Sequence, residues 1–117
     1  MIIEETEARA FAEGWLAAWN DHDLEQVLSL CAPGIVFFSP VAERRAGSGR
    51  VEGIDRLRRY WAAWLEADPG LKFELTAVLS GFRCLTILCR NQQGQSIAET
   101  LEFQADGKVI RGFACYA

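Results

Sequence analysis

The sequence of 117 residues is poor in the side chains from which metal sites and disulfide frameworks are usually built. His22 is the only histidine, and it stands just before a predicted helix cap, where we expect it to be exposed. We therefore predict neither a serine–histidine pair nor a multi-histidine metal site, and we expect no metal and no organic cofactor. The cysteines form no Cys-x-x-Cys pair and are expected to be reduced and buried: Cys31, Cys84, Cys89 and Cys115.

The sequence also lacks an excess of basic residues, a basic leader followed by an apolar segment, and an apolar run long enough to span a bilayer. Sixteen acidic residues outweigh twelve basic ones, which gives a formal net charge of −4. Because the basic residues are expected to be spread along the chain, we predict no nucleic acid and no membrane as a partner. A single domain over residues 1–117 and a cytoplasmic location are the expectation.

Apolar residues recur at spacings of three and four in three segments, which predicts three helices. The first helix covers about Glu4–Trp19 and carries three aromatic residues on one stripe. The second begins at a capping box formed by Asp23 and Gln26, and we expect Pro33-Gly34 to end it. The third opens at Gly53, and its arginines are predicted to face solvent: Arg56, Arg58 and Arg59.

Strand-like segments follow the first two helices and fill the second half of the chain. A short strand is expected over Ile35–Phe38, and residues Val41–Glu52 are predicted to form an irregular, mobile surface loop over the mouth of a pocket. Four further strands are expected over Leu71–Leu79, Phe82–Arg90, Ser96–Ala105 and Lys108–Tyr116. Helices followed by an antiparallel meander predict an α+β fold.

The last two strands are predicted to form a hairpin, because Asp106-Gly107 is a strong turn signal between strand-like segments. A two-residue turn predicts these pairs: Phe103 with Ile110, Glu102 with Arg111, Leu101 with Gly112, and Glu99 with Ala114. Glu99 then lies on an apolar face beside small residues, so we expect an unfilled space next to its carboxylate. Desolvation should raise its pKa by about one or two units. The alternative is a carboxylate held in the core by an indole or a backbone donor.

Several motifs carry a resemblance to a known family: Trp19-Asn20 before the helix at Asp23-Leu24, Ser39-Pro40 after the first strand, Gly53 at the third helix, and the hairpin Asp106-Gly107-Lys108. In these motifs and in its order of elements the chain resembles the nuclear transport factor 2-like superfamily, and within it the SnoaL-like proteins and the ketosteroid isomerases. The resemblance implies a cone-shaped fold in which a curved antiparallel sheet wraps around the helices and an internal apolar pocket. It also implies a homodimer formed through the sheet.

The resemblance assigns roles to individual positions of this sequence. Glu99 falls where ketosteroid isomerases have a protonated aspartate that donates a hydrogen bond to the developing oxyanion. Ser39 falls where they have the aspartate that moves the proton, and a serine at its ordinary pKa does not do this unaided. Trp15 falls on the tyrosine that completes the oxyanion hole, and Cys31 and Trp61 replace the tyrosines that support it. The resemblance therefore implies the architecture of these enzymes without steroid isomerase chemistry.

The sequence predicts a pocket protein for a small apolar, oxygen-bearing molecule, with cofactor-independent acid/base chemistry of isomerase, hydrolase or cyclase type. Glu99 and Ser39 are the predicted catalytic residues. The predicted ligand-binding residues are Trp15, Trp19, Tyr60, Trp61, Leu101, Gly112, Ala114 and Tyr116. Two alternatives use the same fold: a non-catalytic ligand-binding domain, and a dimerisation domain whose pocket is filled by its own tryptophans. A homodimer is expected through the sheet face that carries Ala98, Thr100, Phe113 and Cys115.

Overall fold

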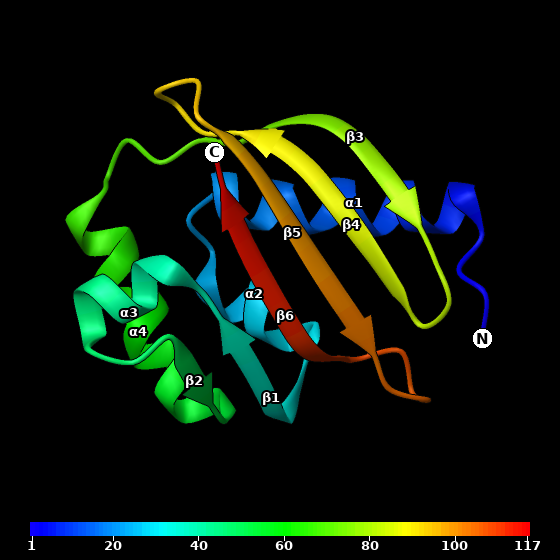
Figure 1. The fold of residues 1–117 in the computed structure, drawn as a ribbon, viewed down its shortest axis with the longest axis horizontal. Coiled ribbons are helices and arrows are strands. Elements are labelled where there is room, and N and C mark those ends of the chain that lie inside the picture. Colours follow the sequence, from blue (N-terminus) through cyan, green and yellow to red (C-terminus); the bar gives the residue numbers. More distant parts are fainter.

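The computed structural model describes residues Met1 to Ala117. In chain order the elements are α1 (Glu5–Asn20), α2 (Leu24–Ser29), β1 (Cys31–Phe38), α3 (Pro40–Ala46), β2 (Arg50–Glu52), α4 (Ile54–Ala67), β3 (Glu74–Ser80), β4 (Cys84–Arg90), β5 (Ser96–Phe103) and β6 (Val109–Tyr116). The six strands form one sheet in the order β2-β1-β6-β5-β4-β3, in which only β1 and β6 run parallel. The sheet is curved, and α1 crosses behind its long antiparallel strands (Figure 1). The predicted α+β architecture is confirmed, with a fourth helix and a sixth strand added.

The helices begin and end where local chemistry favours it. The stripe of α1 that the sequence predicted is buried except for Phe11, which is half-buried. Glu5 and Glu7 occupy the first turn of α1, where acidic side chains complement the helix dipole. Asp23 caps α2 by accepting a hydrogen bond from the Gln26 backbone N–H over 3.2 Å, as expected. Gly53 has a φ of +89° immediately before α4, a left-handed conformation that disfavours other residues. None of the four helices is both long enough and apolar enough to cross a membrane.

The segment from Val41 to Glu52, predicted to be an irregular loop, instead forms most of α3 and all of β2. The Ser39 hydroxyl accepts hydrogen bonds from the backbone N–H groups of Val41 and Ala42, at 3.1 and 3.4 Å. Pro40 stands at the first position of α3, where its missing N–H costs nothing, and Gly47 ends the helix in a left-handed conformation. The prediction was wrong because the Ser-Pro pair starts a short helix as well as ending a strand.

The first strand is longer than predicted, because α2 ends at Ser29 and β1 already begins at Cys31. Pro33-Gly34, expected to terminate the helix, lies inside this strand. The pairing of β1 with β6 is interrupted between Cys31 and Val36, so the sheet requires no backbone donor from Pro33. His22, expected to be exposed, is half-buried and hydrogen-bonds to the Leu71 carbonyl oxygen from its Nε2 at 2.9 Å.

The terminal hairpin keeps most of its predicted register. Three predicted pairs are confirmed: Glu102 with Arg111, Leu101 with Gly112, and Glu99 with Ala114. Phe103, however, pairs with Val109 and not with Ile110, because the register shifts next to the turn. The Gln104 N–H donates to the Lys108 carbonyl oxygen over 2.9 Å, which leaves a turn of three residues that ends at Gly107 in a left-handed conformation. The shift buries Val109 completely and leaves Ile110 half-buried.

All four cysteines are free, as predicted, although only Cys31 and Cys89 are buried while Cys84 is half-buried and Cys115 is exposed. The core lies on the helix-bearing side of the sheet. Tryptophan rings from α1 and α4 meet there edge-on, with the Trp61 ring centre 6.2 Å from that of Trp15 and 5.0 Å from that of Trp19. Aromatic side chains therefore fill much of the concave side.

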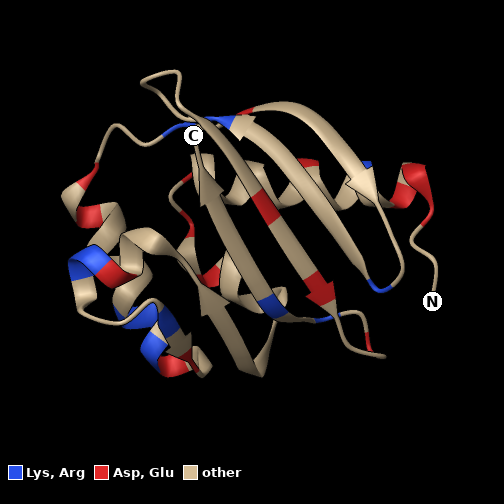
Figure 2. Cartoon of the chain, viewed as in Figure 1, with Lys and Arg blue, Asp and Glu red and all other residues tan.

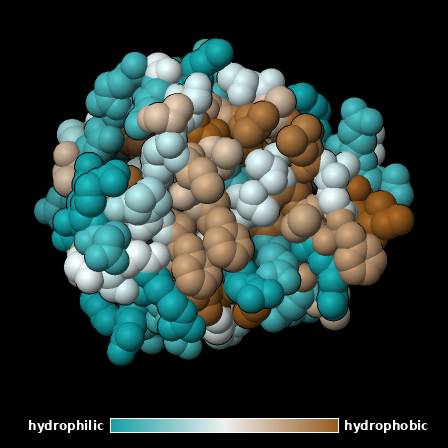
Figure 3. All heavy atoms as spheres, in the orientation of Figure 1, coloured by the Kyte–Doolittle hydropathy of each residue, from teal (hydrophilic) through white to brown (hydrophobic).

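The other face of the sheet carries no helix. Apolar side chains gather over its centre in the space-filling view (Figure 3). Phe113 is 39% exposed and stacks on Phe38, with ring centres 4.8 Å apart. Phe113 thus points away from the helices, as the alternation of β6 predicted.

Candidate functional site

Glu99 lies in the middle of β5, with its side chain on the concave, helix-bearing side of the sheet. Strand alternation puts it on the same face as the buried residues Ile97 and Leu101. The Trp15 Nε1–H, from α1, donates a hydrogen bond to Glu99 Oε1 over 2.6 Å. The indole is therefore a fixed partner of the carboxylate, and it ties the first helix to a central strand. A short hydrogen bond to a charged acceptor is among the stronger kinds.

A small hollow of about 10 Å³ lies beside the Glu99 carboxylate. Nine of its ten lining residues are hydrophobic, and Glu99 is the only charged one. The lining residues come from α1, α4, the segment before β3, and strands β4 to β6: Trp15, Leu16, Trp19, Trp64, Phe73, Ile87, Cys89, Ile97, Glu99 and Tyr116. A hollow of this size holds about one water molecule at most. The predicted pocket beside Glu99 is thus nearly filled by the aromatic side chains of the chain itself.

Burial governs the electrostatics of this hollow. Desolvation raises the pKa of Glu99 from 4.5 to about 7, and the hydrogen bond from Trp15 lowers it by less. The direction is the one that the sequence predicted. Burial first and the Glu99 charge second raise the pKa of the Cys89 thiol to about 12. The same two causes, in the same order, raise the pKa of Tyr116. Of the titratable groups that line this hollow, Glu99 is therefore the one whose pKa lies near neutral pH.

A second hollow of about 150 Å³ adjoins the first and opens toward solvent. Four residues line both hollows: Trp64, Phe73, Ile97 and Tyr116. Val41 and Arg45, which belong to α3, line the outer hollow together with residues of the β4–β5 turn. The two hollows form a funnel whose narrow end is Glu99 and whose mouth is bordered by α3. The segment expected over the mouth therefore does border it, although as a helix.

The three hydroxyl groups predicted for the site are placed differently: Tyr116 lines both hollows, whereas Ser39 and Tyr60 line neither. Ser39 is 4% exposed, and its proximity acts on the pKa of both Tyr60 and Tyr116, lowering each against a larger rise caused by burial. Ser39 Oγ already accepts two backbone hydrogen bonds as the cap of α3, so its own hydrogen is the part left to donate. Of the predicted polar residues, Glu99 and Tyr116 line the inner hollow, whereas Ser39 is the buried cap of α3 and does not line it.

The other predicted binding residues divide between the hollow and the core. Trp15 and Trp19 line the inner hollow, whereas Trp61, Leu101, Gly112 and Ala114 are packed in the core and do not line it. The free space expected beside Gly112 is occupied, because a Cβ there would lie 3.1 Å from Cδ1 of Phe37. Gly112 therefore makes room for that ring and not for a ligand.

Sequence reasoning missed most of the apolar lining. Ile97 was within reach, because it stands two residues before Glu99 on the same strand face. Cys89 pairs with Ile97 across β4 and β5, and only the pairing register of those strands reveals it.

Trp61 Nε1 is the only buried side-chain nitrogen or oxygen without a hydrogen-bond partner. No group of three or more His, Cys, Asp or Glu side chains comes together in the chain.

Comparison with known proteins identifies the family and the fold of the chain. The model of the SnoaL-like domain family matches residues 12–112. No curated protein matches the chain. A SnoaL-like protein of unknown function from Burkholderia thailandensis E264 is 34% identical, with a TM-score of 0.96 over 100% of this chain and 99% of that one. A candidate isomerase of the SnoaL-like family from Agrobacterium tumefaciens C58 is 18% identical, with a TM-score of 0.77 over 96% and 98% of the two chains.

A third solved structure, the candidate hydroxylase AclR from Streptomyces galilaeus, is 21% identical to the chain. It superposes with a TM-score of 0.74 over 97% of this chain and 91% of that chain. At such identities the last two structures carry the fold alone. The family match over residues 12–112 and the relative at 34% identity also show the family. This chain belongs to the SnoaL-like family.

Proposed function

We propose that the protein binds a small apolar, oxygen-bearing molecule in the funnel and performs cofactor-independent acid/base chemistry on it, with Glu99 as the group that gives and takes the proton. The observation that carries the proposal is the Glu99 carboxyl, with a pKa of about 7 in an apolar hollow. At neutral pH about half of such groups are protonated, so one residue serves as donor and acceptor in turn. Tyr116 and Ser39 supply hydroxyl groups that orient the oxygen of the ligand.

Proteins of the same fold support this class of function. The superposed structures include a candidate isomerase, a candidate hydroxylase, and an epoxide hydrolase/cyclase-like enzyme, SalBIII, named for a role in pyran ring formation. These proteins share 12 to 21% identity with the chain, so they favour a range of chemistry and no single reaction. The isomerase, hydrolase and cyclase types therefore all stay within the proposal.

Ligand entry requires side chains to move, because the inner hollow is too small for an organic molecule. Tyr116 and Trp64 are half-buried and form part of the wall between the two hollows. Rotation of these two side chains would join the outer hollow of about 150 Å³ to Glu99. We propose that this rotation opens the site.

The test uses cyclohexanone, a small apolar ketone whose α-hydrogens exchange with deuterium when an acid/base group acts on them. Binding is followed by the ¹³C shift of its carbonyl, and exchange by loss of the α-hydrogen signal in D₂O. The wild-type protein is expected to shift the carbonyl signal and to accelerate exchange. Glu99→Gln should abolish the acceleration, while Glu66→Gln, an exposed glutamate on α4, should leave it unchanged.

The outcomes separate the proposal from its alternatives. A carbonyl shift without accelerated exchange would replace the enzyme with a non-catalytic ligand-binding domain. Equal exchange with wild type and Glu99→Gln would remove Glu99 from the chemistry. No shift at any ketone concentration would favour the second candidate below.

A dimerisation domain is the second candidate, and the nearly filled inner hollow favours it. The outer sheet face supports a homodimer, since Phe38 and Phe113 stack there with Phe113 partly exposed. We propose that this face, which includes Ala98, Thr100, Phe113 and Cys115, packs against the same face of a second copy. Such a dimer is compatible with a working funnel, because the hollows lie on the opposite side of the sheet.

A further inference from the structure

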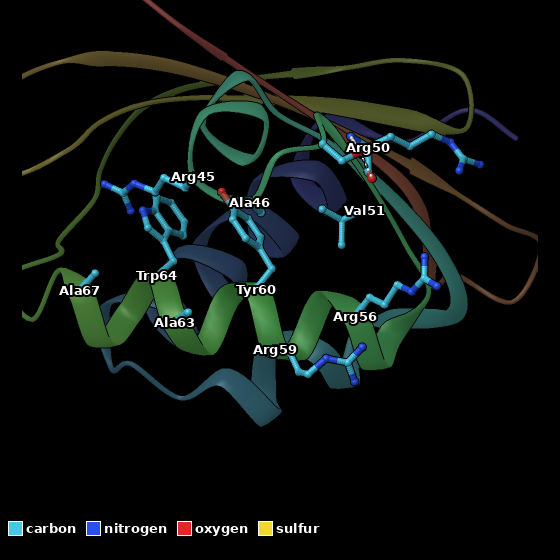
Figure 4. Close-up of a pocket in the computed structure, with 11 residues that line it drawn as sticks. Arg45, Ala46, Arg50, Val51, Arg56, Arg59, Tyr60, Ala63, Trp64 and Ala67 are labelled. Atoms are coloured by element: carbon cyan, nitrogen blue, oxygen red, sulfur yellow. Dashed lines mark hydrogen bonds between the residues drawn. The ribbon is translucent and has the colours of Figure 1, made fainter.

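A groove of about 670 Å³ lies between α4 and the segment of α3 and β2, and it shares Arg45 and Trp64 with the outer hollow of the funnel. Its walls are α3, the loop that follows it, β2 and α4 (Figure 4). The residues that line it are Arg45, Ala46, Ser48, Arg50, Val51, Arg56, Arg59, Tyr60, Ala63, Trp64 and Ala67. Its volume falls in the range of about 300 to 1,000 Å³ that is typical of small-molecule sites. This groove is larger than the two hollows beside Glu99, and although Trp64 borders all three, Glu99 itself does not line the groove.

Arginine dominates the charge of the groove. Half of the twelve basic residues stand between Arg44 and Arg59, so they are clustered and not spread along the chain as predicted. The cluster is visible over α3, β2 and α4 (Figure 2). Four arginines line the groove and no acidic residue does. Of these four, Arg50 alone forms an ion pair, with Glu52 at 3.0 Å. Three guanidinium groups are therefore free in a chain whose net charge is −4.

The floor of the groove is apolar and elongated. It follows α4 from Arg56 to Ala67, which is about 16 Å of helix at 1.5 Å per residue. Arg45 lies beside Trp64 at one end, Arg50 and Arg56 lie at the other, and Tyr60 stands between them (Figure 4). Both aromatic side chains are half-buried, so each offers surface to the groove. The aromatic surface of the groove therefore lies between arginines at its two ends.

We propose that this groove binds an organic anion, namely a molecule with a flat apolar body and a phosphate or carboxylate group. Guanidinium groups recognise both anions through paired hydrogen bonds, and they do so best when no carboxylate of the protein competes. Tyr60 and Trp64 contact the apolar body. A face of arginines that is merely solvated needs neither a concave shape nor an aromatic floor. The groove has both, and it lacks acidic residues among its lining.

The experiment measures binding of 1-naphthyl phosphate to the full chain by isothermal titration calorimetry. The neutral analogue 1-naphthol tests the need for charge, and 1-naphthoate distinguishes carboxylate from phosphate. The double variant Arg56→Gln/Arg59→Gln removes two charges from the groove. Arg9→Gln/Arg90→Gln is the matched control, because it removes two charges from exposed arginines elsewhere. Arg59→Lys keeps the charge and removes the planar fork.

We expect the groove variant to weaken the affinity for 1-naphthyl phosphate by about tenfold and the control by less than about twofold. Raising the salt from about 20 to about 150 mM should weaken binding to the wild type and affect the groove variant less. The affinity of Arg59→Lys for 1-naphthyl phosphate should lie between that of the wild type and that of the groove variant. Tighter binding of 1-naphthoate than of 1-naphthyl phosphate would identify the carboxylate as the natural anion. Equal losses in the two double variants, or binding of 1-naphthol as tight as that of the phosphate, would overturn the proposal.

Discussion

Replacement of Glu99 by glutamine tests the electrostatic reasoning most directly. The folded pKa of this carboxyl is about 7 and its usual value is 4.5, so between these values the folded state binds more protons than the unfolded state. The contribution of Glu99 to stability is therefore present at low pH and is lost as pH rises through this window. With about 1.4 kcal/mol per pKa unit, ionisation costs the folded state roughly 3 kcal/mol by pH 7.

Glutamine resembles the protonated acid but differs from it in one respect. Its oxygen still accepts from Trp15 Nε1, while its amide places an additional N–H in the apolar hollow at a cost of about 1 kcal/mol at any pH. We therefore expect Glu99→Gln to raise the free energy of unfolding by roughly 2 kcal/mol at pH 7 and to lower it by roughly 1 kcal/mol at pH 4. The change of sign between these pH values is the signature.

Urea unfolding of both proteins from pH 4 to 8 measures this difference, and the pH dependence shared by all other groups cancels in it. A ¹³C titration of the Glu99 carboxyl gives the pKa independently. Glu66→Gln, at an exposed position of α4, should show no such dependence. A carboxyl that titrates at or below 4.5, together with a loss of stability in Glu99→Gln at pH 7, would refute the reasoning. The carboxylate would then be a structural acceptor for Trp15.

Three other substitutions test the architecture. Wild type should be a dimer by light scattering at micromolar concentration and Phe113→Glu a monomer, whereas a monomeric wild type would contradict the proposed interface. Gly112→Ala should lower the free energy of unfolding by about 1 kcal/mol because its Cβ would crowd the Phe37 ring, and an unchanged urea midpoint would show that the ring yields freely. Ser39→Ala should cost about 1 kcal/mol in a thermal melt by removing the cap of α3, and an unchanged melting temperature would show that the cap does not stabilise this helix.

Much of the fold could be predicted because the strongest signals are local. The aromatic stripe of α1, the cap at Asp23 and most of the terminal hairpin follow from spacing and turn chemistry. The errors lie where two local interpretations compete. Ser39-Pro40 ends a strand and also begins α3, and Pro33-Gly34 sits inside a strand because the pairing there is interrupted. The sequence near each pair does not decide between a strand end and a helix start, because the outcome depends on how the neighbouring strands pair.

The position of Glu99 could be predicted from the sequence, and the shape of the site around it could not. Glu99 stood out as a carboxylate on an apolar strand face, and its position beside Ala114 is confirmed. The volume next to it depends on the distant side chains that fill it. Phe37 from β1 occupies the space above Gly112, and the sequence of the hairpin alone does not predict this contact. The arginine groove was missed for a related reason, since α3 was not expected to exist.

The parallel pairing of β1 with β6 has a consequence for how the molecule assembles. It joins the β1–β2 pair to the meander of β3 to β6, and it brings Val36 together with Arg111 across most of the sequence. Contacts between residues so far apart in the sequence form late in folding, because closing the long intervening loop costs conformational entropy before the contacts stabilise the chain. We expect the formation of this β1–β6 pairing to set the folding rate. Until it closes, Phe37 has no Gly112 to pack against, and the wall beside Glu99 stays incomplete.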